Sequence, residues 1–172
     1  MSGGDRDGPL SATLTGDAVA MIRAGALSRT LVGVGVDAVD VDRFRRVLAR
    51  RPHLSDRLFT EAERAYALRA SDPVPRFSTR FAAKEATMKA LGVGLGAFPF
   101  AEVEVVRLDL DAPTMVLRGT ALARATGAGV VRWHLSLTHT DRVAMAMVIA
   151  EGGPDTRRPP ETGQPADCAA KP

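Results

Sequence analysis

The sequence predicts an α+β domain in which helices pack on a largely antiparallel sheet. Apolar patterns with the helical period of 3.6 residues come mostly in the first half of the chain, and patterns that alternate every two residues come mostly in the second half. This order differs from the regular strand–helix alternation of parallel α/β proteins. The last two strand patterns are also close enough in sequence to pair through a tight turn, which makes them antiparallel.

The composition is that of a globular protein with one core. The chain has 172 residues, of which 45% are hydrophobic and 25% are charged. One cysteine, Cys168, rules out a disulfide framework or a cysteine-based metal site within the chain and favours the reducing cytoplasm. No apolar run approaches the ~20 residues that cross a bilayer, so no membrane partner is expected. The net charge of +3 is compatible with an acidic partner or a phosphate ligand and does not choose between them.

The two ends differ in composition from the middle of the chain. Residues 1–29 begin with small and polar residues, and residues 152–172 have no apolar period and hold five of the 11 prolines. We therefore expect a flexible N-terminal extension over 1–29, the working domain over 30–151 and a disordered tail over 152–172.

The working domain begins with a predicted strand over Leu31–Asp37. Its valines alternate with Gly33, Gly35 and Asp37, so one face is apolar and the other is nearly bare. Such a bare face allows a ligand or another backbone to approach closely. Asp40 is placed to cap a helix that runs through about Arg50.

Two more helices are expected before the second half of the domain. Thr60 and Glu63 have the spacing of a capping box, which predicts a helix through Ala70. After a break at Asp72–Pro75, a longer helix is predicted from about Arg76 to Leu91 and ended by Gly92. The remaining elements are predicted strands over Glu102–Leu110 and Thr114–Leu117, a helix over Thr120–Thr126, and strands over Val131–Thr138 and Arg142–Ala150.

Glu85 is the first candidate for a functional residue. In the segment RFAAKEATMKAL it lies four residues after Phe81 and three before Met88, so it points into an apolar helical stripe. A carboxylate that faces a core is costly unless it is paired or binds a metal. Lys84 and Lys89 border the stripe. The alternative is a Glu–Lys pair on a solvated face, worth about 0.3–0.5 kcal/mol.

Asp37 is the second candidate, because it ends a strand on the glycine face. The alternative is a turn or helix-capping aspartate. Two carboxylates with few other ligands suit Mg²⁺, which keeps several waters and binds substrate phosphates. The cysteine-rich and multi-histidine patterns of zinc sites are absent from the sequence.

Two polar surfaces complete the candidates. In WHLSLTHT, His134, Ser136 and Thr138 share one strand face and could bind phosphates by hydrogen bonding, although a merely solvated face explains them equally well.

Arg43, Arg46 and Arg50 lie opposite the apolar stripe of their helix and could steer an acidic protein or a nucleic acid, or be merely solvated. The scarcity of aromatic residues argues against single-stranded nucleic acid. The run GVGLG at 92–96 follows a helix and therefore fails the context of a dinucleotide or P-loop fingerprint.

Together these segments resemble the holo-acyl-carrier-protein synthases, the short class of phosphopantetheinyl transferases. The resemblance covers about residues 31–150, and four segments carry it: GVGVDAVDVDR at 33–43, FTEAE at 59–63, RFAAKEATMKALGVGLG at 80–96 and HLSLTHT at 134–140. The family's Gly-Lys-Pro turn is replaced by Asp111–Ala112–Pro113, and both terminal segments fall outside the match.

The resemblance implies the small phosphopantetheinyl transferase fold and a specific site. Asp37 and Glu85 would hold Mg²⁺, or Mn²⁺ in its place, together with a phosphate of coenzyme A. Lys89 would contact the phosphates and His134 the nucleotide portion, and further coenzyme contacts are expected at Lys84, Gly92, Gly94, Ser136, Thr138 and His139. The arginine face with Arg43, Arg46 and Arg50 would dock the acidic carrier protein. Family members of this length are typically homotrimers with active sites between subunits.

The implied reaction moves 4′-phosphopantetheine from coenzyme A to a serine of an apo acyl carrier protein and releases 3′,5′-ADP. The serine attacks the β-phosphate, and Mg²⁺ and Lys89 stabilise the charge that develops on the phosphoryl oxygens. Glu85 or a metal-bound water takes the serine proton. Such an enzyme acts in fatty acid biosynthesis and lipid metabolism, although a carrier protein of polyketide or peptide synthesis fits the sequence equally well.

Two other functions are compatible with parts of this pattern. A metal-dependent nuclease also uses acids and a lysine, but commonly places the lysine two residues after the acid on a strand, whereas Glu85 and Lys89 are four apart on a predicted helix. A degenerate transferase that only binds coenzyme A or a carrier protein would not need Asp37, Glu85 and Lys89 together.

Overall fold

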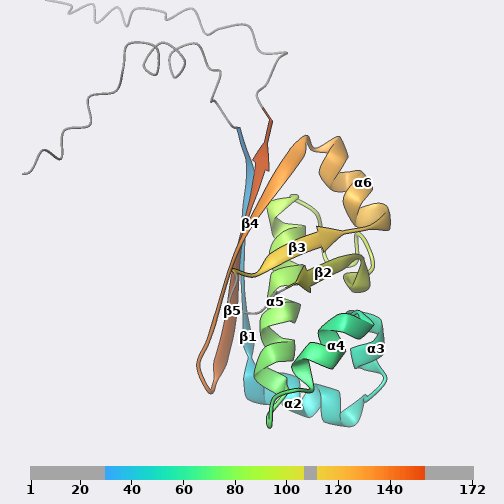
Figure 1. Ribbon diagram of the computed structural model, residues 1–172, viewed down its shortest axis with the longest axis vertical. Coiled ribbons are helices and arrows are strands. Elements are labelled where there is room, and N and C mark those ends of the chain that lie inside the picture. The colour runs from blue at the N-terminus through green and yellow to red at the C-terminus, as the bar shows by residue number, and fades with distance from the viewer. Residues whose placement is uncertain (1–29, 107–111, 154–172) are drawn as a thin grey trace, which may run out of the picture. The chain divides into compact units, whose positions relative to one another are not determined.

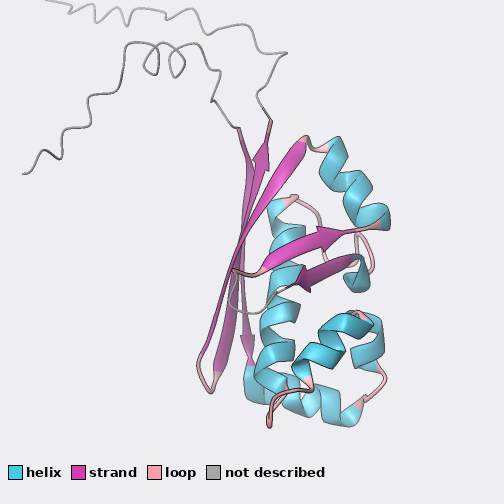
Figure 2. Ribbon diagram, viewed as in Figure 1, coloured by secondary structure: helices cyan, strands magenta, loops and turns pink. Residues whose placement is uncertain are grey.

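The computed structural model describes residues 30–106 and 112–153 of the chain. Some predictions concern residues outside these ranges. They are the N-terminal extension, the tail, the turn at Asp111 and the end of the predicted strand over Glu102–Leu110. Figures 1 and 2 show a sheet of long strands with one long helix packed along it and shorter helices around that helix. This is the predicted α+β arrangement.

The main sheet has three strands in the order β1–β5–β4, and both pairs are antiparallel. The strands are β1 (Leu31–Asp40), β4 (Val130–His139) and β5 (Val143–Gly152). β4 and β5 form the predicted hairpin, whose turn is closed by a hydrogen bond from the Thr140 backbone N–H to the Val143 carbonyl. β5 runs two residues beyond the predicted end, so Gly152 belongs to the sheet and not to the tail.

The helix α5 (Val74–Ala90) packs against the bare face of β1. A Cβ atom on Gly33 would lie 2.0 Å from the Ala90 carbonyl oxygen, and one on Gly35 would lie 1.8 Å from that of Ala86. Both distances are far below van der Waals contact, so only glycine permits this approach. The bare face therefore receives a helix backbone, which resolves the alternative that the sequence left open.

The short helices α2 (Val41–Arg50), α3 (Leu54–Leu58) and α4 (Glu61–Ala67) lie around the first half of α5. Asp40 caps α2 by accepting the Arg43 backbone N–H at 2.7 Å, and Thr60 and Glu63 form the predicted capping box of α4. The sequence pattern did not predict α3, which is too short to show a period. α4 ends three residues before the predicted Ala70. α5 begins before the predicted Arg76, because Pro75 lies in its first turn, where a missing N–H costs nothing.

A second, two-stranded sheet is the main difference from the prediction of a single sheet. After the 3₁₀ turn η1 (Phe100–Glu102), β2 (Val103–Val106) pairs with β3 (Thr114–Leu117) in an antiparallel ladder. The helix α6 (Gly119–Gly127) follows. These elements cover α5 on the side away from the main sheet, so α5 is buried on nearly all sides and not along one stripe.

Candidate active site

Asp37, Glu85 and Lys89 come together where α5 crosses β1. Asp37 follows the two glycines on the face of β1 that meets α5, and Glu85 and Lys89 are one turn apart on α5. The Lys89 ammonium donates to Asp37 Oδ1 at 2.8 Å and to the Val36 carbonyl oxygen at 2.9 Å. The Asp37 side chain is only 10% exposed, whereas that of Lys89 is 52% exposed. The close approach of α5 at the two glycines thus places both carboxylates in one site.

The electrostatics of this site favour an added cation. Burial, and then the negative charge of Asp37, raise the pKa of Glu85, while Lys89 opposes them. Two carboxylates that share one lysine thus resist being charged together. Within residues 30–106 and 112–153 no set of three or more His, Cys, Asp or Glu side chains is arranged to hold a metal. A metal here would have two protein carboxylates, which fits the preference of Mg²⁺ for keeping water and phosphate ligands.

A cavity of about 590 Å³ opens beside the two carboxylates. The charged residues of its lining are Asp37, Asp40, Arg43 and Glu85. The rest of its wall is mostly apolar, with Phe44, Leu54, Leu58, Phe81, Leu95 and Phe100 among the lining residues. Its volume lies within the ~300–1,000 Å³ typical of ligand sites. The cavity can therefore hold an organic molecule, and a cation on Asp37 and Glu85 would let a phosphate of that molecule lie beside them.

His134, Ser136 and Thr138 do not join this site within one chain. Trp133, Leu135 and Leu137 of β4 pack into the core, so the three polar residues that alternate with them lie exposed on the opposite face of the sheet. His134 Nε2 lies 2.6 Å from Glu151 Oε2. The sequence predicted the shared face of the three residues correctly but did not show that the sheet separates them from Asp37.

His139 lies near a second small cavity that the sequence did not predict. This cavity has a volume of about 230 Å³, and its lining includes Arg76, Arg80, Tyr66 and His139. The Arg80 guanidinium lies 4.1 Å above the Tyr66 ring and is 3% exposed, and its Nε atom has no hydrogen-bond partner among the described residues. A buried guanidinium with an unused donor, beside a second arginine and a histidine, is suited to an anion.

Arg80 and Glu85 face different sides of α5. At 100° per residue they are about 140° apart around the helix. The two sites are therefore separated by the helix itself in a single chain. The sequence signal for this cavity was an arginine pair at the spacing i, i+4 in a helix that is otherwise largely apolar.

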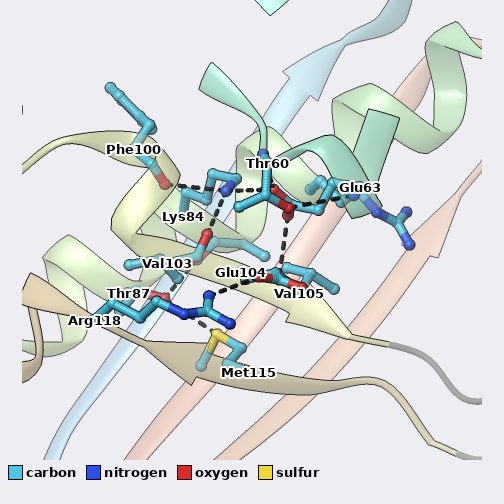
Figure 3. Close-up of polar contacts among 12 residues, drawn as sticks. Thr60, Glu63, Lys84, Thr87, Phe100, Val103, Glu104, Val105, Met115 and Arg118 are labelled. Atoms are coloured by element: carbon cyan, nitrogen blue, oxygen red, sulfur yellow. Dashed lines mark hydrogen bonds and ion pairs between the residues drawn. The ribbon is translucent and has the colours of Figure 1, made fainter. Parts of the chain in front are cut away.

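Lys84 was predicted to contact coenzyme A, and the structure contradicts this. Its side chain is 0% exposed, and its ammonium donates to Glu63 Oε2 at 2.8 Å, to the Phe100 carbonyl at 3.0 Å and to the Val103 carbonyl. Figure 3 shows Lys84 enclosed by these acceptors, with Glu63 also accepting the backbone N–H of Val105. The hydrogen bonds of Lys84 connect α5 to α4 and β2, and no part of its side chain is exposed to a ligand.

The remaining candidates lie at the surface. Gly92 and Gly94 are exposed in the turn after α5, and the positive φ of Gly92, 66°, requires glycine there. Arg43, Arg46 and Arg50 are exposed on α2, and Arg43 also lines the 590 Å³ cavity.

No described helix is both long and apolar enough to cross a membrane.

The chain is similar to known enzymes over this whole region. The profile of the 4′-phosphopantetheinyl transferase superfamily matches residues 33–148. A holo-[acyl-carrier-protein] synthase of Frankia alni is 48% identical over 121 residues, which cover 70% of this chain and 98% of the relative. A synthase of the same name from Caldanaerobacter subterraneus is 38% identical over 120 residues, covering 70% and 94%.

Solved structures of holo-[acyl-carrier-protein] synthases are also similar to this chain. The holo-[acyl-carrier-protein] synthase of Neisseria meningitidis matches with a TM-score of 0.65 and 28% identity, covering 70% of this chain and 98% of that one. The Bacillus anthracis synthase, solved in complex with CoA (3′,5′-ADP), matches with a TM-score of 0.60 and 29% identity, covering 72% and 98%. With its two carboxylates meeting across β1 and α5, the chain belongs to the 4′-phosphopantetheinyl transferase superfamily and, within it, to the holo-[acyl-carrier-protein] synthases.

Proposed function

We propose that this chain transfers 4′-phosphopantetheine from coenzyme A to a serine of an apo acyl carrier protein, with Mg²⁺, and releases 3′,5′-ADP. The observation that carries the proposal is that Asp37 and Glu85 lie together in the wall of the larger cavity, with Lys89 bound to Asp37, in a chain of this family. The carrier protein of fatty acid biosynthesis is the first substrate to test. The proposed location is the cytoplasm, which suits the single cysteine.

Asp37 and Glu85 are the residues that would hold Mg²⁺, or Mn²⁺ in its place. When bound, the ion supplies positive charge to the phosphoryl oxygens of the coenzyme. Lys89 is half exposed and contacts Asp37, so its ammonium would be available to a phosphate bound beside that carboxylate. The exposed turn with Gly92 and Gly94 follows directly after α5 and would border the same ligand.

The smaller cavity would bind another phosphate of coenzyme A. Coenzyme A carries a 3′-phosphate in addition to its pyrophosphate, and Arg80, Arg76 and His139 form a preformed anion site. Because α5 separates this cavity from Glu85 in one chain, a single coenzyme would use the smaller cavity of one copy and the carboxylates of another. The smaller cavity thus supports a site built between subunits.

The exposed face of the main sheet supports the proposed homotrimer. Val36, Met147 and Ser136 are aligned across the three strands, and their side chains share this face. Val34 is 49% exposed, Val36 45%, Met145 39% and Met147 44%, so the face is a contiguous apolar patch of the kind that is usually covered by a partner. A second copy on this face would also receive His134, Ser136 and Thr138, the predicted coenzyme contacts that do not reach Asp37 within one chain.

Met147→Asp is expected to disrupt this assembly and, with it, transfer activity. The substitution places a charge at the centre of the apolar face, where burial in an interface would be costly. Size-exclusion chromatography with light scattering measures the effect, and Leu122→Asp, at a 50% exposed apolar position of α6, is the matched control. An unchanged oligomer in the Met147 variant would show that this face is not the interface.

The arginine face of α2 would dock the carrier protein. Arg43, Arg46 and Arg50 are exposed on α2, and Arg43 lines the larger cavity, whose wall is mostly apolar. A partner that carries acidic side chains around an apolar one would match both features. Docking there would bring the partner to the end of the cavity at which Asp37 and Glu85 lie.

The proposed activity is tested by incubating the protein with coenzyme A, Mg²⁺ and an apo acyl carrier protein. Mass spectrometry should show that the carrier protein gains one phosphopantetheine group, and chromatography should show 3′,5′-ADP. A carrier protein whose serine is replaced by alanine is the control. A carrier protein of unchanged mass would leave only a binding role and contradict the proposal.

Metal binding is expected to weaken as the pH falls through the raised pKa of Glu85. Only the carboxylate binds the ion, and the pKa of Glu85 lies above the ordinary glutamate value because of burial and Asp37. The sign for stability is opposite in the metal-free protein: the contribution from protonated Glu85 is present below the ordinary pKa and is lost as the pH rises through the raised one. The stabilisation by Mg²⁺, measured as the rise in Tm at a series of pH values, should therefore grow with pH across this window. A rise in Tm that does not depend on pH would contradict this.

A further inference from the structure

The ammonium of Lys89 lies against one carboxylate oxygen of Asp37, a proposed ligand of the metal ion. It contacts Asp37 Oδ1 at 2.8 Å and the Val36 carbonyl oxygen at 2.9 Å, both from β1. Asp37 is 10% exposed, so few other directions of approach to its carboxylate remain open. An ion on Asp37 and the Lys89 ammonium would therefore compete for the carboxylate of Asp37.

The lysine is free to move, whereas its partner is not. Lys89 is 52% exposed in the last turn of α5, and an exposed lysine has several rotamers of similar energy. The backbone of Asp37 is held in the ladder between β1 and β5, opposite Ala146, and its side chain is only 10% exposed, which restricts its rotamers. Displacement would thus move the lysine side chain and leave the carboxylate in place.

We propose that the Lys89 ammonium occupies the position of a cation on Asp37 when no metal ion is bound and is displaced from it when the ion binds. The released ammonium is then available to a phosphate of the coenzyme. This inference rests on the proposed function, because it takes Asp37 to be a metal ligand.

Displacement couples the binding of the metal to that of the coenzyme. Without coenzyme, the ion must replace the hydrogen bond from Lys89 to Asp37, which lowers its apparent affinity. A bound phosphate offers Lys89 another partner, so it raises the affinity for the ion, and by linkage the ion raises the affinity for the coenzyme by the same factor. Lys89 thereby favours the state in which the metal ion and the coenzyme are both bound.

The test measures Mn²⁺ binding to the full chain in the absence of coenzyme, by isothermal titration calorimetry. Lys89→Met should bind Mn²⁺ roughly tenfold more tightly than the wild type, since the competing ammonium is removed. Arg43→Met is the charge-matched control, because it removes a positive charge from the cavity that Asp37 and Glu85 line and leaves the Lys89–Asp37 contact intact. An equal gain in both variants, or none in the Lys89 variant, would overturn the displacement.

A second readout follows the lysine itself. The sequence holds three lysines, Lys84, Lys89 and Lys171, so mass spectrometry can follow the acetylation of each by an amine reagent. Saturating Mg²⁺ should accelerate acetylation at Lys89 several-fold and leave the fully buried Lys84 unreactive. No acceleration at Lys89 would contradict its release.

Failure of the inference can be distinguished from failure of the proposed function. Asp37→Asn should abolish Mn²⁺ binding if Asp37 is a metal ligand, whatever Lys89 does. Wild-type Mn²⁺ binding in that variant would overturn the metal site itself. Loss of binding in Asp37→Asn combined with an unchanged affinity in Lys89→Met would overturn the displacement alone.

Discussion

Replacing Glu85 with glutamine is expected to lower kcat/KM for transfer to the carrier protein by about a thousandfold or more. Glutamine has nearly the same shape but carries no charge, so the proposed site would lose one of its two protein ligands for the ion. Metal ions and preorganised charges contribute several kcal/mol to phosphoryl transfer, which corresponds to a rate loss of this size. The rate is measured from the mass gain of the carrier protein at saturating Mg²⁺.

The folded state should survive this substitution. Glu85 is only partly buried, and burial together with the charge of Asp37 already raises its pKa, so a neutral side chain relieves an unfavourable charge pair. We expect an unchanged or slightly higher Tm without metal, and loss of the rise in Tm on adding Mg²⁺. Glu61→Gln, the same substitution at an exposed position of α4, is the matched control. Wild-type activity of the Glu85 variant at the same Mg²⁺ concentration would contradict the proposed role of Glu85 as a metal ligand.

The sequence predicted part of the environment of Glu85, and its role as a metal ligand stays a prediction. An acid within the period of Phe81 and Met88 is expected to face inward, and the structure places Glu85 partly buried, next to Asp37. The glycines before Asp37 similarly predicted a close approach. What the sequence could not show is that the approaching group is the backbone of α5, because that contact depends on how the helix packs on the sheet.

Residues whose role depends on tertiary contacts could not be assigned in this way. The apolar stripe on α5 was predicted too narrow, because α4, η1 and the second sheet cover the remaining sides of the helix. Lys84 was therefore placed at the border of the stripe and near the ligand, although it is enclosed with Glu63, 21 residues earlier in the chain. The pairing of Arg80 with His139 at one cavity likewise joins α5 to β4, and no local period contains it.

Lys84→Met is expected to reduce the free energy of unfolding by about 3–5 kcal/mol, the cost of removing one partner of a buried ion pair. This is a large fraction of the ~5–15 kcal/mol that stabilises a typical domain. The substitution preserves much of the side-chain volume, but it leaves the Glu63 carboxylate charged in the interior and removes a donor from the carbonyls of Phe100 and Val103. Urea unfolding followed by circular dichroism measures the loss. Lys89→Met is the matched control, because that lysine is half exposed and should cost less than about 1 kcal/mol.

A double variant separates the charge from the packing. Glu63→Gln keeps an amide oxygen that can accept the Val105 backbone N–H, so Lys84→Met/Glu63→Gln contains no buried charge at this position. We expect the double variant to be more stable than Lys84→Met alone, because an uncompensated carboxylate costs more than a neutral amide in the same place. A double variant that is less stable than Lys84→Met would mean that Glu63 acts mainly through its hydrogen bonds to Thr60 and Val105, and that its charge contributes little. The buried pair would then serve to connect α4 to β2, with Lys84 filling the space between them.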